Sequence, residues 1–274
     1  MPGFQEAVPD PQRSGAAWQP DGLAKSIDRW IFVFMAAFLM TVTLGGFIPD
    51  SLMRIDRVRV GALPPFPALL HVHAALMGAW LTLLLAQTTL MATGRRAAHR
   101  QLGMASLVLA PLIVVVGFML VPTINHLAWD FLHRSPTVDP AEVRTTLARQ
   151  AGNGLLQIRA GIGFSLFVAL AIWARRRDSG LHKRMMILAT TMPMTAAINR
   201  IVWLPTTRPE SPLSLELFGL MLVVPMLAWD LVRTRQFHRA YRIFFAVNLV
   251  LSALIHSLWN SPVTIRALGW SMGY

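Results

Sequence analysis

Seven long apolar segments set what this chain can fold into. Counted from the sequence, they run over residues 30–48, 67–93, 103–125, 153–174, 184–205, 213–232 and 243–260. At 1.5 Å per residue, segments of this length suit a bilayer core about 30 Å thick. The short alternating segments of a membrane β-barrel are not seen, and backbone groups in lipid must be satisfied internally. We therefore predict an all-α fold, an integral membrane helical bundle of seven transmembrane helices.

Composition supports this class and excludes several kinds of chemistry. Only 14% of the 274 residues are charged, against about 25% in soluble domains. Cysteine is absent, which excludes disulfides, thiolate metal sites, iron–sulfur clusters and covalently attached c-type haem. The sequence also lacks a Gly-rich phosphate loop and the HExxH and GxSxG motifs.

The distribution of charge predicts the orientation. The loops after the second, fourth and sixth segments carry twelve basic residues and one acid, Asp178. The positive-inside rule places these loops in the cytoplasm, with the N-terminus in and the C-terminus out. The net charge of +12 is then explained mostly by basic loops that lie on the cytoplasmic side of the membrane. We expect the basic loops to face anionic lipid headgroups, and we expect no nucleic acid as a partner.

The chain divides into a polar tail, a membrane domain and a second tail. Residues 1–28 are polar and lack the pattern of a cleavable signal peptide, residues 29–262 hold the seven helices, and residues 263–274 form an extracytoplasmic tail. Asp139 followed by Pro140 is typical of a helix start. We therefore expect a short outer helix near residues 140–150.

The inner loops share a basic pattern that suggests three helical hairpins after a lone first helix. They contain His99-Arg-Gln-Leu-Gly, His182-Lys-Arg-Met-Met and His238-Arg. The first two, with the segment from His71 to Trp80, resemble several uncharacterised bacterial polytopic inner-membrane families over about residues 67–200. Some of those families resemble accessory proteins of haem–copper oxidase assembly. The resemblance implies an inner-membrane protein and points towards haem or metal chemistry, and it transfers no catalytic residue.

Four ionisable residues lie inside apolar segments: His73, Arg159, Arg200 and His256. A charged side chain in hydrocarbon costs roughly 2.5–3.5 kcal/mol for Arg on insertion scales, so each needs a partner, a water-filled cavity or a function. Counting residues from the ends of the segments places all four, together with Glu216, in the outer third of the membrane. We therefore predict a polar site at that depth.

Helical periodicity turns several polar residues towards the bundle interior. His73, Met77 and Trp80 share one face of the second segment, whereas His71 lies about 200° around the helix from His73. Polar or small residues repeat at every fourth position in three further segments, in stripes through Gln157, Thr195 and Asn248. Such stripes face other helices rather than lipid.

Structural roles compete with functional ones for these residues. Arg200 is close enough to the boundary to extend its charged group into water. Glu216 suits an interfacial residue paired with Arg159, Arg200 or Arg208. His71 and His73 suit the interface, and Trp80 and Met77 suit the core. Arg159 and His256 are the hardest to explain by packing alone.

The first functional hypothesis is a cofactor site for electron transfer. Imidazoles from two helices suit the iron of a b-type haem, and arginines suit its propionates. His73 (or His71) and His256 would be the metal ligands, and a quinone in the same site is a variant. The proposed cofactor-binding residues are His73, His256, Arg159, Arg200, His71, Trp80 and Met77.

Two other classes of function compete with it. One is a non-catalytic accessory or assembly subunit that docks on other membrane subunits and holds no cofactor. The other is an outer zinc or copper site, or a small-anion transporter built around Arg159 and Arg200. The metal site would draw on His71, His126, His133, His256 and Glu216. The sequence leaves open whether the protein is an enzyme.

Overall fold

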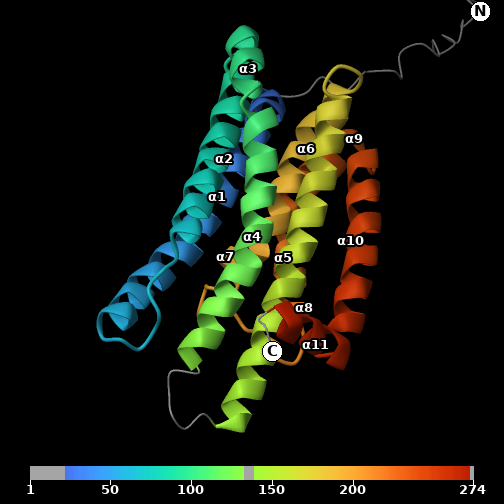
Figure 1. Cartoon of the computed structure of the whole chain (residues 1–274). Helices are drawn as coiled ribbons and strands as arrows, with labels where there is room; N and C mark the ends of the chain where they lie inside the picture. Colours follow the sequence, from blue (N-terminus) through green and yellow to red (C-terminus); the bar gives the residue numbers. More distant parts are fainter. Residues whose placement is uncertain (1–21, 133–138, 272–274) are drawn as a thin grey trace, which may run out of the picture.

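The computed structural model describes residues 22–132 and 139–271, and within them it is all-helical with no strand. The helices follow one another along the chain, and the longest described stretch without helix runs from Asn199 to Pro212 (Figure 1). Their bounds are α1 Gly22–Arg59, α2 Ala68–Ala92, α3 Arg96–Gly103, α4 Ser106–Leu132, α5 Pro140–Ala174, α6 Ser179–Thr191, the 3₁₀ turn η1 Met192–Met194, α7 Thr195–Ile198, α8 Leu213–Met221, α9 Val224–Thr234, α10 Arg239–Leu258 and α11 Pro262–Ser271.

Five helical stretches among the described residues are long and apolar enough to cross a membrane. They lie in α1, α2, α3–α4, α5 and α10. Helices α8 and α9 together give a sixth candidate span, bent by 43° where they meet. The predicted helical membrane bundle is confirmed at this level.

The segment predicted as one helix over residues 184–205 is divided. Its helix α6 ends at Thr191, η1 contains Pro193, and α7 ends at Ile198. Proline lacks an N–H and its ring crowds the preceding turn, so the regular helix stops there. The chain then runs without helix to Pro212, and the predicted helical end at residue 205 is therefore wrong.

Two further predicted boundaries, near residues 150 and 263, differ from those in the structure. The short helix expected near residues 140–150 is the first part of the continuous 35-residue helix α5. Its start is as expected, since Asp139 Oδ1 accepts a hydrogen bond from Ala141 N at 2.8 Å and Pro140 follows the cap. The tail expected from residue 263 is largely helix α11, whose Ile265 packs with Leu147 of α5.

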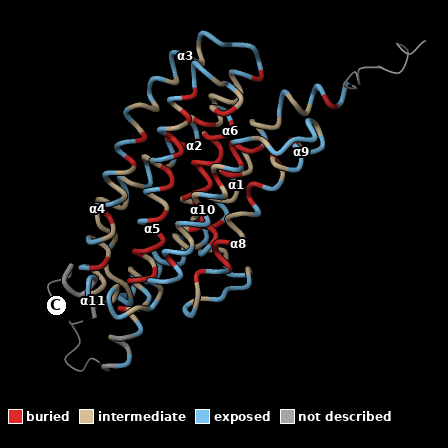
Figure 2. Tube along the Cα trace, turned by 90° about the vertical axis from the view of Figure 1, so that its right-hand side faces the viewer, coloured by how far each residue is buried: buried red, intermediate tan, exposed pale blue. Residues whose placement is uncertain are grey.

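Helix α5 is central to the packing. It contacts α4, α6, α10 and α11, while α1 contacts α2, α6 and α7. The buried residues concentrate where these helices face one another (Figure 2), as at Phe167 and Leu188, which are fully buried. Large apolar side chains such as Phe34 and Leu249 are exposed on the outside, as expected of a lipid-facing surface.

The basic connections lie at one end of the bundle, with α3 and the turns that precede α6 and α10 (upper end in Figure 1). Two of their histidines are bonded to the preceding helix. His99 Nδ1 is 3.3 Å from the carbonyl of Gln87, and His182 Nδ1 is 2.8 Å from that of Ala171. His238 instead accepts a hydrogen bond from the N–H of Ala240. All three loop histidines thus have a structural role.

Candidate functional site

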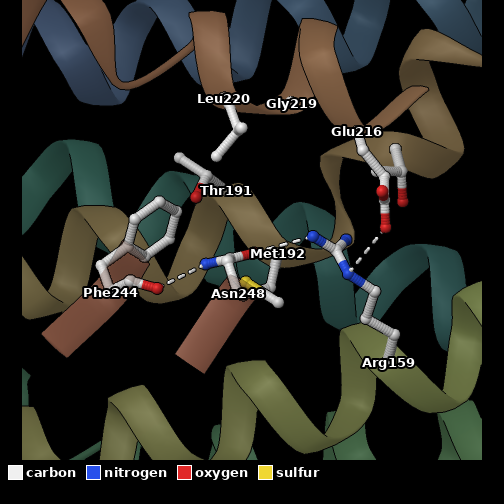
Figure 3. Close-up of a pocket in the computed structure, with 9 residues that line it drawn as sticks. Arg159, Thr191, Met192, Glu216, Gly219, Leu220, Phe244 and Asn248 are labelled. Carbon is white, nitrogen blue, oxygen red and sulfur yellow. Dashed lines mark hydrogen bonds and ion pairs between the residues drawn. The ribbon is translucent and has the colours of Figure 1, made fainter. Parts of the chain in front are cut away.

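Arg159, Glu216, Asn248 and His256 form a connected polar cluster between α5, α8 and α10. Arg159 Nη2 donates to Asn248 Oδ1 at 2.7 Å, and its Nε lies 3.5 Å from Glu216 Oε1 (Figure 3). The other carboxylate oxygen, Glu216 Oε2, lies 2.9 Å from His256 Nε2. Three elements far apart in the sequence therefore converge on one guanidinium and one carboxylate.

Local structure explains how these groups are aimed. Glu216 lies in the first turn of α8, where the positive end of the helix dipole favours a carboxylate. Asn248 donates from Nδ2 to the carbonyl of Phe244 at 2.9 Å, one turn earlier in α10. That bond holds the amide so that its oxygen faces Arg159 (Figure 3).

The cluster is charged, and most of it is closed to the outside. The side chains of Arg159 and Glu216 are only 5% and 7% exposed, whereas that of His256 is 39% exposed. Burial on this scale is tolerated because opposite charges are paired. His256 therefore joins a buried ion pair to the surface of the protein.

A small cavity adjoins the ion pair. It has a volume of about 10 Å³ and is lined by Arg159, Glu216, Thr191 and Thr195 among others. A cavity of about 10–15 Å³ holds one water molecule. Arg159 Nε and Glu216 Oε1 are close enough to attract, yet neither makes a hydrogen bond. The cavity is large enough for one water molecule or a proton carrier of similar size. It is far too small for a porphyrin or a quinone ring.

Trp80 and Met77 belong to the packed core. Trp80 is 1% exposed, and its indole N–H donates to Thr190 Oγ1 at 3.0 Å. Its ring also meets Phe164 edge-on, with ring centroids 4.9 Å apart. Met77 packs on the same core. Both residues hold α2 against the centre of the bundle.

His71 and His73 lie away from the cluster. His73 faces α4, where a Cβ added to Gly117 would be 3.4 Å from its Cε1, and its Nδ1 is buried without a hydrogen-bond partner. His71 is exposed and meets Phe66 edge-on. Helix α2 packs on α1 and α4, and α10 packs on α5 and α6. The structure therefore does not bring either histidine to His256.

Arg200 also has a separate environment. Arg200 lies two residues after α7, where it donates from Nε to Asp50 Oδ2 of α1 at 3.0 Å and from Nη1 to the carbonyl of Ala196 at 2.6 Å. Its guanidinium lies 4.3 Å from the ring centroid of Phe47. The partner Asp50 lies just beyond the apolar segment predicted over residues 30–48.

A second buried ionic cluster lies near the basic end and is not among the predicted sites. Arg184 of α6 makes a two-pronged contact with Asp230 of α9, at 2.7 and 2.6 Å, and the hydroxyl of Tyr241 also donates to Asp230. The signal was present in the sequence as an acid inside the sixth segment. All three side chains are satisfied by one another, which suits a structural role.

Metal ligands do not gather in the described part of the chain. Within residues 22–132 and 139–271, no group of three or more His, Asp or Glu side chains is placed to hold a metal ion. Of the residues proposed for an outer metal site, His133 lies outside the described residues.

Comparison of the chain with protein-family models, with curated proteins and with solved structures gives no match.

Proposed function

We propose that this chain is a seven-span protein of the bacterial inner membrane, with its N-terminus in the cytoplasm. The α8–α9 pair would be a bent span, and α6, η1 and α7 a broken one, since Ser179 to Ile198 covers roughly 30 Å at 1.5 Å per residue. The grouping of the basic turns at one end supports this orientation (Figure 1). Those turns would face anionic headgroups of the inner leaflet.

Within this frame, the cluster around Arg159 is an intramembrane proton-binding site that exchanges protons with the outer aqueous phase. The observation that carries this proposal is the contact between His256 and Glu216. An imidazole that is partly exposed touches a carboxylate that is almost fully buried, at 2.9 Å. Ionisable side chains in this arrangement inside a membrane are typical of proton relays.

The chemistry follows from the two ring nitrogens of His256. With Nε2 protonated, the neutral ring donates to Glu216 Oε2, and Nδ1 is the atom that binds an incoming proton. The Nε2–H bond then breaks as an O–H bond forms on Glu216, leaving a neutral ring protonated at Nδ1. Arg159 stays protonated throughout and favours the ionised carboxylate, so the proton on Glu216 is held transiently.

Infrared difference spectroscopy tests this assignment directly. The purified protein in lipid would be titrated with acid while the carbonyl band of protonated carboxyl groups is recorded. We expect acid to produce one component of this carbonyl band that is missing in Glu216→Gln and shifted in His256→Asn. His99→Asn is the matched control, because it changes a loop histidine far from the cluster. An unchanged spectrum in Glu216→Gln contradicts the proposal.

The geometry favours proton binding over the predicted b-type haem, because His73 and His256 lie on helices that pack mainly on different neighbours and the cavity is small. Haem, quinone, zinc or copper binding and an accessory role beside other membrane subunits stay predictions. Oxidised and dithionite-reduced visible spectra, with a metal assay, test the cofactors. A haem spectrum lost in His256→Ala and kept in His99→Ala would favour the haem site, and a stable co-purifying partner would favour the accessory role.

A further inference from the structure

An apolar groove lies between α1, α7 and α8, away from the Arg159 cluster. Its volume is about 410 Å³, within the range of about 300–1,000 Å³ that ligand pockets occupy. Along α1 it reaches from Phe38 to Gly45, or roughly 10 Å at 1.5 Å per residue. Met221 and Trp203, which also line it, are 58% and 79% exposed. The groove is therefore open on the lipid-facing surface of the bundle.

Two neighbouring glycines show how the groove is formed. A Cβ on Gly46 would lie 2.3 Å from the carbonyl oxygen of Ala197, so Gly46 allows α1 and α7 to touch. A Cβ on Gly45 would have nothing within 4 Å. One glycine thus holds the two helices together, and the adjacent one faces open space at the groove.

The end of the groove near Arg200 carries excess positive charge. The oxygen Oδ2 of Asp50 lies 2.9 Å from Arg54 Nε and 3.0 Å from Arg200 Nε. One carboxylate is shared by two guanidiniums, which leaves a net charge of about +1 in this group. The side chain of Arg54 is 46% exposed. Arg200 is followed at once by Ile201, which lines the groove.

We propose that this groove binds one anionic phospholipid of the outer leaflet, with an acyl chain along α1 and the phosphate at Arg54 and Arg200. The occupant is chosen by the combination of two features. An apolar channel open to hydrocarbon suits a lipid chain, and paired guanidiniums at its interfacial end suit a phosphate. The site is distinct from the proton-binding cluster, because Phe218 and Met221 of α8 line the groove while Glu216 and Gly219 line the polar cavity.

Native mass spectrometry of the whole protein in mild detergent tests the chain-binding part, with phosphatidylglycerol as the probe. We expect one tightly bound molecule in the wild type and at least a tenfold weaker affinity in Gly45→Phe, which fills the groove. Gly78→Phe is the matched control, since Gly78 is an exposed glycine of α2 with equally open space. Thr41→Phe fills the groove from one turn away and decides the result if Gly45→Phe does not fold.

The phosphate-binding part is tested by selectivity. We expect the wild type to prefer phosphatidylglycerol to phosphatidylcholine, and Arg54→Gln to lose at least threefold of that preference while still binding a lipid. Wild-type affinity in both groove-filling variants would overturn the groove assignment. Unchanged selectivity in Arg54→Gln would overturn the phosphate assignment. Recovery of a quinone in place of a phospholipid, displaced by Gly45→Phe, would overturn the proposed occupant.

Discussion

The buried pair of Arg159 and Glu216 gives the sharpest prediction about stability. Its charged atoms are 3.5 Å apart, so Coulomb's law with an effective dielectric constant of about 20 gives an attraction of about 5 kcal/mol. Desolvation offsets much of this attraction in the native pair. Removing one partner leaves the other charge buried, which costs about 3–5 kcal/mol. We expect Arg159→Leu and Glu216→Leu each to destabilise the protein on that scale.

The double variant should recover much of that loss, because no charge is left unpaired in it. Unfolding of each variant in mixed micelles, followed by tryptophan fluorescence, gives the coupling energy, which we expect to be about 2–3 kcal/mol. Arg59 and Asp56 provide the control, since they are 3.3 Å apart with both side chains 74% exposed. Their coupling should be below about 1 kcal/mol. Equal coupling in the two pairs would refute the reasoning.

Two further predictions concern packing and acid stability. Gly46→Ala should destabilise the protein by about 1–3 kcal/mol through its collision with Ala197, and Gly45→Ala should be neutral or stabilising by up to about 1 kcal/mol; equal melting temperatures would contradict this. The hydrogen bond from the N–H of Leu181 and, to a smaller extent, the interaction with Arg239 hold the pKa of Asp178 below its ordinary value. A depressed folded-state pKa stabilises the protein above the ordinary pKa of about 3.9, and the effect is lost as pH falls through the folded value. The stability difference from Asp178→Asn should therefore shrink below about pH 4, and a pH-independent difference would argue against it.

The spans could be predicted from the sequence because apolar length is a local property. The positions at which the helices are interrupted depend on individual residues such as prolines and helix caps. Pro193 interrupts the segment predicted over residues 184–205, and after the short helix α7 the chain runs without helix from Asn199 to Pro212. The Asp139 cap was readable, but no signal marked where the helix after it would stop. The structure therefore has one continuous helix, α5, where the sequence predicted two.

The depth of the candidate site in the membrane could be predicted from the sequence. Which helices come together to form it was harder to predict. Counting residues placed Arg159, Glu216 and His256 at one level, and they are in contact. The same count placed His73 at that level, but depth does not say which helices are neighbours. Arg200 was separated for another reason, since its partner Asp50 belongs to a helix that continues well past the predicted end of the first segment.

Nitrogen-15 NMR of labelled histidine in proteoliposomes tests the proton-binding proposal most directly. His256 in the wild type should be protonated at Nε2 when neutral, and its signal should respond when only the pH facing the C-terminal side is changed. In Glu216→Gln its tautomer should change. A His256 signal that ignores the pH on that side, or that is identical in Glu216→Gln, would contradict a proton path through this pair.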